Sequence, residues 1–174
     1  MNHSKRLVAV GLVVALAGGA WAREHGAMSP SPDGDTRRPL PLTAMMAAHQ
    51  KANMREHLAA VERIVGAIAR DDMPGVEKAS SALGFSESMG QMCEHLGAAA
   101  PGFTPMALQF HRTADGIAVA ARGGDRKAVL TALDTTLQAC VGCHAAYRQE
   151  IVDQATWDRL AAEAGAAQGA AHGH

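Results

Sequence analysis

The sequence has few aromatic side chains: three Phe, two Trp and one Tyr among 174 residues. A core must therefore be built mainly from Leu, Val, Ile, Met and Ala, since 48% of the residues are hydrophobic. Val and Ile do not alternate with polar residues in the body of the chain, so β architectures are disfavoured. We expect an all-α protein of one domain, because this length suits a single domain with tails.

An excess of either charge is also missing, because 16 Lys and Arg residues accompany 17 Asp and Glu residues. The formal net charge of −1 gives no electrostatic basis for binding nucleic acid. Charged residues make up 19% of the chain, and beside the large hydrophobic share this argues against wholesale disorder. The composition favours a globular protein without a nucleic-acid partner.

Residues 1–22 have the pattern of a secretory signal peptide. Lys5 and Arg6 precede an apolar run from Leu7 to Ala20, and Ala20-Trp21-Ala22 forms a small-x-small cleavage site. The run is short for a membrane helix, so we expect cleavage and no stable membrane span afterwards. We therefore predict export to an oxidising compartment, the bacterial periplasm. An uncleaved amino-terminal anchor is the alternative.

The rest of the chain divides into a leader, a helical domain and a tail. Residues 23–42 are rich in Pro and Gly, cannot hold a helix and are predicted to be a leader or spacer. Residues 43–155 are predicted to be the folded domain. Residues 156–174 become rich in Ala and Gly, and we expect this tail to fray.

Four helical segments are expected within residues 43–155. Thr43 is placed to cap the first, and Pro74 suits the first turn of the second, which stops near Gly84 and resumes over residues 86–96. Thr104-Pro105 begins the third, and Asp125 caps a fourth that is predicted to continue to at least residue 152. Short connections favour antiparallel neighbours, so we predict an up-down-up-down four-helix bundle.

Two helices carry repeating residues that are predicted to face inward. The first helix has steps of three and four between Met54, Leu58, Val61, Val65 and Ile68. The fourth helix has the same spacing between Leu130, Leu133, Leu137, Cys140, His144, Tyr147 and Ile151. The second series is unusual because chemically reactive side chains lie in its middle.

The segment Cys140-Val141-Gly142-Cys143-His144 is a C-x-x-C-H haem-attachment motif. Two thiols three residues apart face the same side of a helix and can form thioethers to both vinyl groups of one porphyrin. The imidazole of His144 follows at once and can reach the iron as the proximal ligand. A thioredoxin-like pair would need a βαβ setting, and a zinc site would need further ligands, so both alternatives are weaker.

A helical bundle with this motif near its carboxyl end, continuing Ala145-Ala146-Tyr147-Arg148, resembles the class II c-type cytochromes, cytochrome c′ and cytochrome c-556. The resemblance implies one covalently bound haem c on the last helix, with Cys140 and Cys143 as attachment sites and His144 as proximal ligand. It also places Arg148 near the haem. Class I cytochromes take a Met near the carboxyl end, which is excluded because no Met follows Met106.

The resemblance further implies that the first helix supplies the distal side of the haem, and the matching residue is Met54. Ligation by Met54 would give a low-spin His/Met haem and a single-electron carrier between redox proteins of an electron-transport chain. No catalytic constellation is present, so an enzyme is not expected. The alternative is a five-coordinate, cytochrome c′-like protein that binds NO or CO. His57 as the ligand, or Leu58 nearest the iron, also remains open.

Cys93 is the third cysteine and lies outside the haem motif. With Met89, Met92 and His95 it forms a group typical of soft-metal ligands, which gives a weaker hypothesis of a metal-handling protein. Burial of Met and Cys as core residues is the more common outcome. A homodimer, joined by a Cys93 disulfide or formed through the first helices as in the class II family, stays open.

Overall fold

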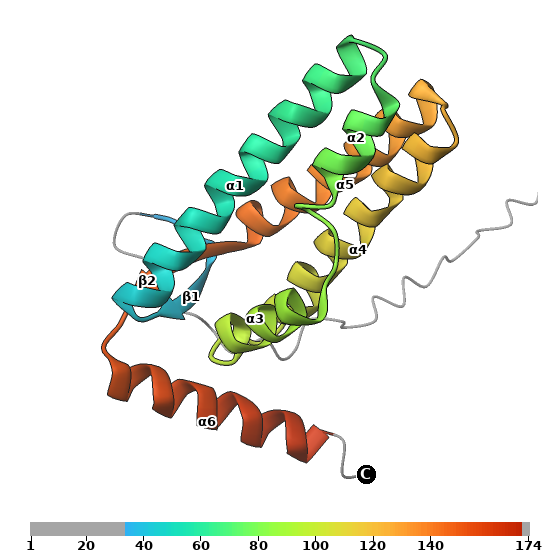
Figure 1. Ribbon diagram of the computed structural model, residues 1–174. Coiled ribbons are helices and arrows are strands. Elements are labelled where there is room, and N and C mark those ends of the chain that lie inside the picture. Colours follow the sequence, from blue (N-terminus) through green and yellow to red (C-terminus); the bar gives the residue numbers. More distant parts are fainter. Residues whose placement is uncertain (1–33, 172–174) are drawn as a thin grey trace, which may run out of the picture.

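Six helices and two short strands make up residues 34–171, the part of the chain that the computed structural model describes (Figure 1). The predicted signal peptide, the first part of the leader and residues 172–174 lie outside these residues. In chain order the elements are β1 (Arg38–Leu42), α1 (Ala44–Ala69), α2 (Met73–Ser80), α3 (Glu87–Gly97), α4 (Phe103–Arg122), α5 (Arg126–Ala146), β2 (Tyr147–Ile151) and α6 (Gln154–Ala171). The predominance of helix confirms the predicted class, whereas the antiparallel four-helix topology stays a prediction.

Four helix starts follow the capping residues that the sequence offers. The exception is α4, which begins at Phe103 after Gly102 without a side-chain cap, because the Thr104 hydroxyl donates to the Cys93 carbonyl instead. The side chain of Thr43 accepts a hydrogen bond from the backbone N–H of Met46, and Asp125 accepts two from the first turn of α5. Asp72 caps α2, with Pro74 in its first turn, and Ser86 caps α3. The predicted interruption of the second helical segment is therefore confirmed as two short helices, α2 and α3.

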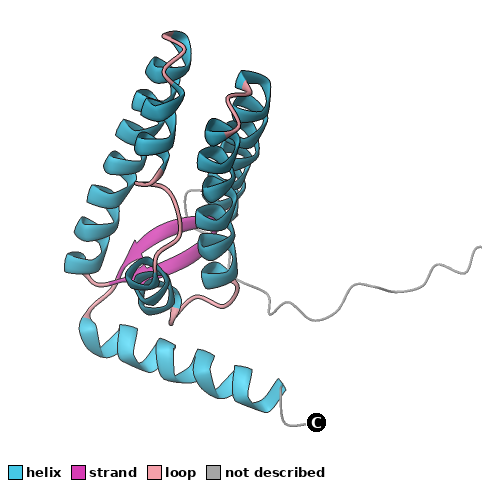
Figure 2. Ribbon diagram, turned by 45° about the vertical axis from the view of Figure 1, so that its right-hand side comes forward, coloured by secondary structure: helices cyan, strands magenta, loops and turns pink. Residues whose placement is uncertain are grey.

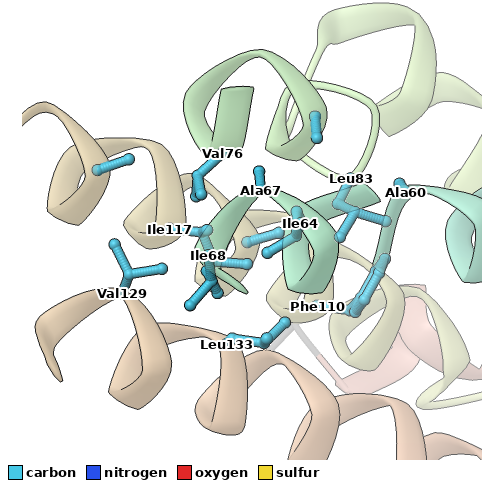
Figure 3. Close-up of a cluster of buried hydrophobic side chains, with 13 residues drawn as sticks. Ala60, Ile64, Ala67, Ile68, Val76, Leu83, Phe110, Ile117, Val129 and Leu133 are labelled. Carbon is cyan, nitrogen blue, oxygen red and sulfur yellow. The ribbon is translucent and has the colours of Figure 1, made fainter. Parts of the chain in front are cut away.

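One hydrophobic cluster holds α1, α2, α4 and α5 together (Figure 3). Helix α1 packs on α2, α2 packs on α4, and α4 packs on α5. The side chains that meet are mostly small or aliphatic, as the scarcity of aromatic residues requires. The largest contributors are Ile64, Ile68, Val76, Leu83, Phe110, Ile117, Val129 and Leu133.

A second cluster forms around the two strands. The strands, magenta in Figure 2, were not predicted from the sequence. β1 and β2 pair in parallel, with Arg38 opposite Tyr147 and Leu42 opposite Ile151. Leu40 and Leu42 are buried, so the end of the predicted leader belongs to the core. The fourth helix was predicted to reach residue 152, but it ends at Ala146 because the following backbone pairs with β1.

The buried face of α1 differs from the predicted stripe. Leu58 and Val65 are 70% and 52% exposed, and of the stripe only Ile68 is fully buried. The buried residues of this helix are instead Met46, Ala47, Gln50, Ala60, Ile64, Ala67 and Ile68. The apolar stripe misled the prediction because the inner face of α1 carries small and polar side chains.

Residues predicted to fray as a tail form α6, which runs past the strands at one end of the molecule (Figures 1 and 2). Trp157 and Ala164 are buried, and Trp157 joins the second cluster and packs on the His95 ring at a centroid distance of 5.2 Å. These two residues are seven apart and therefore share one helix face. Within the described residues, no helix combines the length and apolarity needed to cross a membrane.

Candidate functional site

A cavity of about 760 Å³ lies where the two hydrophobic clusters meet. Helices α1, α3, α4 and α5 and both strands contribute to its wall. All five residues that the sequence singled out line it: Met54, Cys140, Cys143, His144 and Arg148. The fold thus brings the haem motif and the predicted distal residue to one site, although they are far apart in the sequence.

The haem motif occupies the last turns of α5. Cys140 and Cys143 are half-buried free thiols, and burial raises the pKa of each above its usual value. The His144 side chain is exposed, as are Leu130, Leu137 and Ile151 of the predicted inward series. Of that series Leu133 and Tyr147 are fully buried, so the prediction of one continuous inward seam was wrong. The inward series is not continuous because α5 ends at Ala146, before Tyr147 and Ile151, and because Cys140 and His144 border the cavity.

The chain directly after the motif is held firmly. The Tyr147 hydroxyl donates to the Pro101 carbonyl at 3.0 Å, and the Arg38 guanidinium lies 4.2 Å from the centre of the Tyr147 ring. The Tyr147 ring also meets Phe103 edge to face. Gly102, beside the hydroxyl, has a φ of 85°, which a side chain would strain. These contacts fix where α5 stops relative to the cavity.

Arg37, which precedes β1, reaches the haem motif directly. Its Nη1 donates to the carbonyl oxygen of His144 at 3.3 Å, while its Nη2 pairs with Asp35 at 2.7 Å. The hydrogen bond from Arg37 is the largest cause that lowers the pKa of Asp35 to about 2. A carbonyl at a helix end lacks an intrahelical donor, so this guanidinium satisfies the end of α5.

Arg148 enters the cavity wall from β2. Its side chain is 25% exposed and its Nη2 lies 3.1 Å from the Glu150 carboxylate. Its Nε is buried and has no hydrogen-bond partner among the described residues. A buried N–H without an acceptor is costly in free energy, so an acceptor on a ligand at this atom would be stabilising.

The α1 side of the cavity presents Met54 beside polar groups. The Met54 side chain is 37% exposed. Gln50, one turn earlier, is buried and accepts a hydrogen bond from Gln149 of β2 at 2.5 Å. Asn53 Nδ2 lies 2.9 Å from the Met92 sulfur. This wall therefore combines a thioether with side chains that tie α1 to β2 and α3.

His57 and His111 form a pair of imidazoles on the cavity wall, with ring centroids 5.5 Å apart. His111 is buried, and its Nδ1 lies 2.7 Å from the Leu83 carbonyl, which requires a proton on that nitrogen. Burial, with a smaller contribution from the neighbouring His111, lowers the pKa of His57 to about 4. Burial likewise lowers the pKa of His111. Both rings are neutral at pH 7.

The predicted soft-metal group is divided by the fold. Met89, Met92 and Cys93 line the cavity, joined by Met106 of α4, whereas His95 faces Trp157. Cys93 is a buried free thiol whose pKa is raised chiefly by burial. Over residues 34–171, no three His, Cys, Asp or Glu side chains gather into a metal-ion site of their own.

The residues of the cavity fit a haem. The volume is within the roughly 300–1,000 Å³ of cofactor sites, and most of the wall is apolar. One edge carries the paired thiols with His144, and the unsatisfied Nε of Arg148 offers a donor to an anionic group. Sequence reasoning missed Arg37, Gln50 and His111. The one signal that could have placed Arg37 is the alternation of Leu40 and Leu42 with Pro, which is compatible with a short strand directly after it.

The chain matches no protein-family model, no curated protein and no solved structure. The resemblance to class II cytochromes consequently rests on its motif alone.

Proposed function

We propose that this protein is an exported c-type haem protein of the periplasm that transfers single electrons through a low-spin His/Met haem. The observation that carries the proposal is the common cavity of Cys140, Cys143, His144 and Met54. A C-x-x-C-H motif in a helix is a specific signal for covalent haem, and here it borders a cavity of cofactor size. The class II pattern would make the long helices an antiparallel bundle.

In this proposal each residue has a separate role. Cys140 and Cys143 hold the cofactor by thioether bonds, and His144 and Met54 bind the iron from α5 and α1. The bound haem supplies reversible one-electron exchange at its iron. The chain's own contribution is to fix the elements that carry both ligands, since Tyr147 anchors the end of α5 and the Gln149–Gln50 hydrogen bond ties β2 to α1. Ligands held in this way need little rearrangement when the electron moves.

Redox proteins of an electron-transport chain are the proposed partners. The outer face of α5 beside the motif exposes Val141, Gly142 and Ala145 together with His144. These exposed positions carry no acidic or basic side chain apart from His144, so a partner would approach the site over an uncharged surface. The role of Arg148 near the haem belongs to the same proposal.

A second candidate is a five-coordinate haem protein that binds NO or CO. The partial exposure of Met54, at 37%, favours it, because a thioether that is not tightly packed can leave the iron. The two candidates differ in the number of iron ligands. The thioether attachment and the proximal ligand are the same in both.

Absorption spectra of the haem-loaded protein and of Met54→Ala distinguish the candidates. We expect a low-spin spectrum with a Met-to-iron charge-transfer band in the near infrared, lost in Met54→Ala. Met45→Ala is the matched control, because Met45 is 80% exposed and does not line the cavity. A high-spin spectrum that Met54→Ala leaves unchanged, and that shifts with CO, would favour gas binding. Loss of the low-spin spectrum only in His57→Ala would assign bis-His ligation.

A further inference from the structure

The edge of the cavity next to the haem motif carries two arginines that come from opposite ends of the chain. Parallel pairing sets Arg38 opposite Tyr147 and Pro39 opposite Arg148, so Arg37 and Arg148 lie at the same end of the small sheet. Both side chains line the cavity. Asp35 lies near both, since each guanidinium contributes to lowering the pKa of its carboxyl.

Both guanidinium groups are oriented by protein contacts. Arg37 donates to the His144 carbonyl and to Asp35, and Arg148 is paired with Glu150. The buried Nε of Arg148 nevertheless has no acceptor in the described structure. Arginine presents a rigid fork of N–H donors that suits carboxylates. A ligand carboxylate would meet the unsatisfied Nε of Arg148 and would compete with Asp35 for Arg37, whose Nε and Nη2 both donate to that side chain.

Behind this edge the cavity is apolar. Leu96, Phe103, Met106 and Ala107 line it from α3 and α4. A ligand complementary to both the arginine edge and the apolar wall is flat and apolar over most of its surface and bears carboxylates along one edge. A porphyrin with two propionate groups has this chemistry.

We infer that Arg37 and Arg148 form the carboxylate subsite that receives the porphyrin propionates, and that β1 is therefore part of the cofactor site. The inference rests on the proposed haem function. Lys51 and Arg55 also line the cavity, but both are exposed residues of α1. Solvent weakens their attraction for a carboxylate, whereas the partly buried Arg148 is screened less. Arg37 is also 43% exposed, but its hydrogen bonds to Asp35 and to the His144 carbonyl hold it at this edge.

The test compares two metal-free ligands, protoporphyrin and its dimethyl ester, in fluorescence titrations of the full chain produced without haem attachment. Without iron, neither His144 nor Met54 contributes ligation, so the difference between the two ligands isolates the carboxylates. We expect esterification to weaken binding to the unsubstituted protein about tenfold or more, the effect of at least one charge-assisted hydrogen bond. In Arg37→Leu and Arg148→Leu the difference between acid and ester should shrink or vanish.

Two controls keep the test specific. Arg122→Leu removes an arginine that pairs with Glu77 away from the cavity, and it should keep the preference for the acid. Arg55→Leu removes a cation of the cavity wall and should likewise keep the preference for the acid over the ester. Arg37→Lys and Arg148→Lys, which keep the charge, serve if either leucine variant fails to fold by circular dichroism. Lysine lacks the fork, so a partial loss of preference is expected.

Equal binding of acid and ester by the unsubstituted protein would overturn the inference, as would loss of the preference in Arg55→Leu alone. Absence of porphyrin binding would overturn it as well. The proposed function is judged separately, by haem staining of the denatured, matured protein. A positive stain with no acid preference would reject the carboxylate subsite and leave covalent haem intact.

Discussion

The cavity wall contains three thiols, and their positions in the chain predict different roles for them. Cys140 and Cys143 belong to the motif at the end of α5, whereas Cys93 enters from α3 and is the most buried of the three. All three border the same space. Cys93 is therefore an internal control for covalent haem attachment, because its thiol borders the same cavity but lies outside the C-x-x-C-H motif.

Replacing the motif cysteines should abolish stable haem attachment in stages. Cys140→Ala or Cys143→Ala leaves one thioether, and the double variant should carry no haem after denaturation. Cys93→Ala should retain it fully. Mass spectrometry of the matured protein measures each case. Haem loss in Cys93→Ala, or a denaturation-resistant adduct in the double variant, would contradict the assignment.

The buried imidazoles make the free energy of unfolding depend on pH. The pKa of His57 is about 4 in the folded chain and near 6.5 when unfolded, so below pH 6.5 the unfolded state binds the extra proton. The stability that neutral His57 contributes is present above pH 6.5 and is lost as the pH falls toward 4. After a discount for solvent screening, the loss is roughly 1–2 kcal/mol.

Urea unfolding at pH 7 and pH 5 measures this loss. We expect His57→Asn to lose less free energy of unfolding between these pH values than the unsubstituted protein does. His49→Asn is the matched control, because His49 is an exposed residue of the same helix. An identical pH dependence in all three proteins would show that His57 is not the titrating group.

Among the elements, β1 is small but should contribute strongly to stability. Leu42, the last residue of β1, is completely buried in the second cluster. Leu58, on the exposed face of α1, was predicted from sequence to be the inward residue. The two leucines therefore give a direct comparison between the strand and the helix stripe.

Leu42→Ala should lower the free energy of unfolding by about 2–5 kcal/mol, because it opens a cavity in a closed core. Leu58→Ala should change it by roughly 0.5 kcal/mol or less, as is usual for exposed positions. Chemical denaturation of both variants gives the values. A larger cost at Leu58 than at Leu42 would restore the apolar stripe as the buried face.

Local signals in the sequence predicted several helix starts well, but they missed both strands and α6. Thr43 and Asp125 cap helices within three residues of themselves, and the C-x-x-C-H spacing is equally local. The inner face of α1 could not be predicted, because Gln50 and His57 face a cavity and look like surface residues in the sequence. Pairing of β1 with β2 depends on contacts across about a hundred residues, which no local pattern contains.

At the scale of the whole molecule, the cavity lies between two hydrophobic clusters that share α1, α4 and α5. They differ in their other elements, because α2 belongs to the first cluster and α3, α6 and both strands belong to the second. Phe110 and Cys140 belong to or pack on the first cluster, and Phe103 and Cys143 on the second, while all four line the cavity. A ligand that fills the cavity would contact both clusters. Occupancy should therefore couple their unfolding.

Thermal unfolding followed by two probes tests this coupling. Trp157 fluorescence reports on the second cluster, since the other tryptophan, Trp21, lies in the predicted signal peptide. Far-ultraviolet circular dichroism reports on the helices as a whole. We expect the two transitions to separate in the haem-free chain and to coincide, at a higher temperature, when haem is attached. Coincident transitions without haem would show that the shared helices α1, α4 and α5 already couple the two clusters.

The contact between Arg37 and His144 spans 107 residues, and this separation affects the order of events during biosynthesis. A chain emerges from its amino terminus, so β1 is available long before its partner strand exists. Pairing of such distant segments is slow, because the loop between them must close first. The thiols of the motif thus emerge before β1 can pair beside the end of α5, which leaves an interval in which the proposed attachment site is still open.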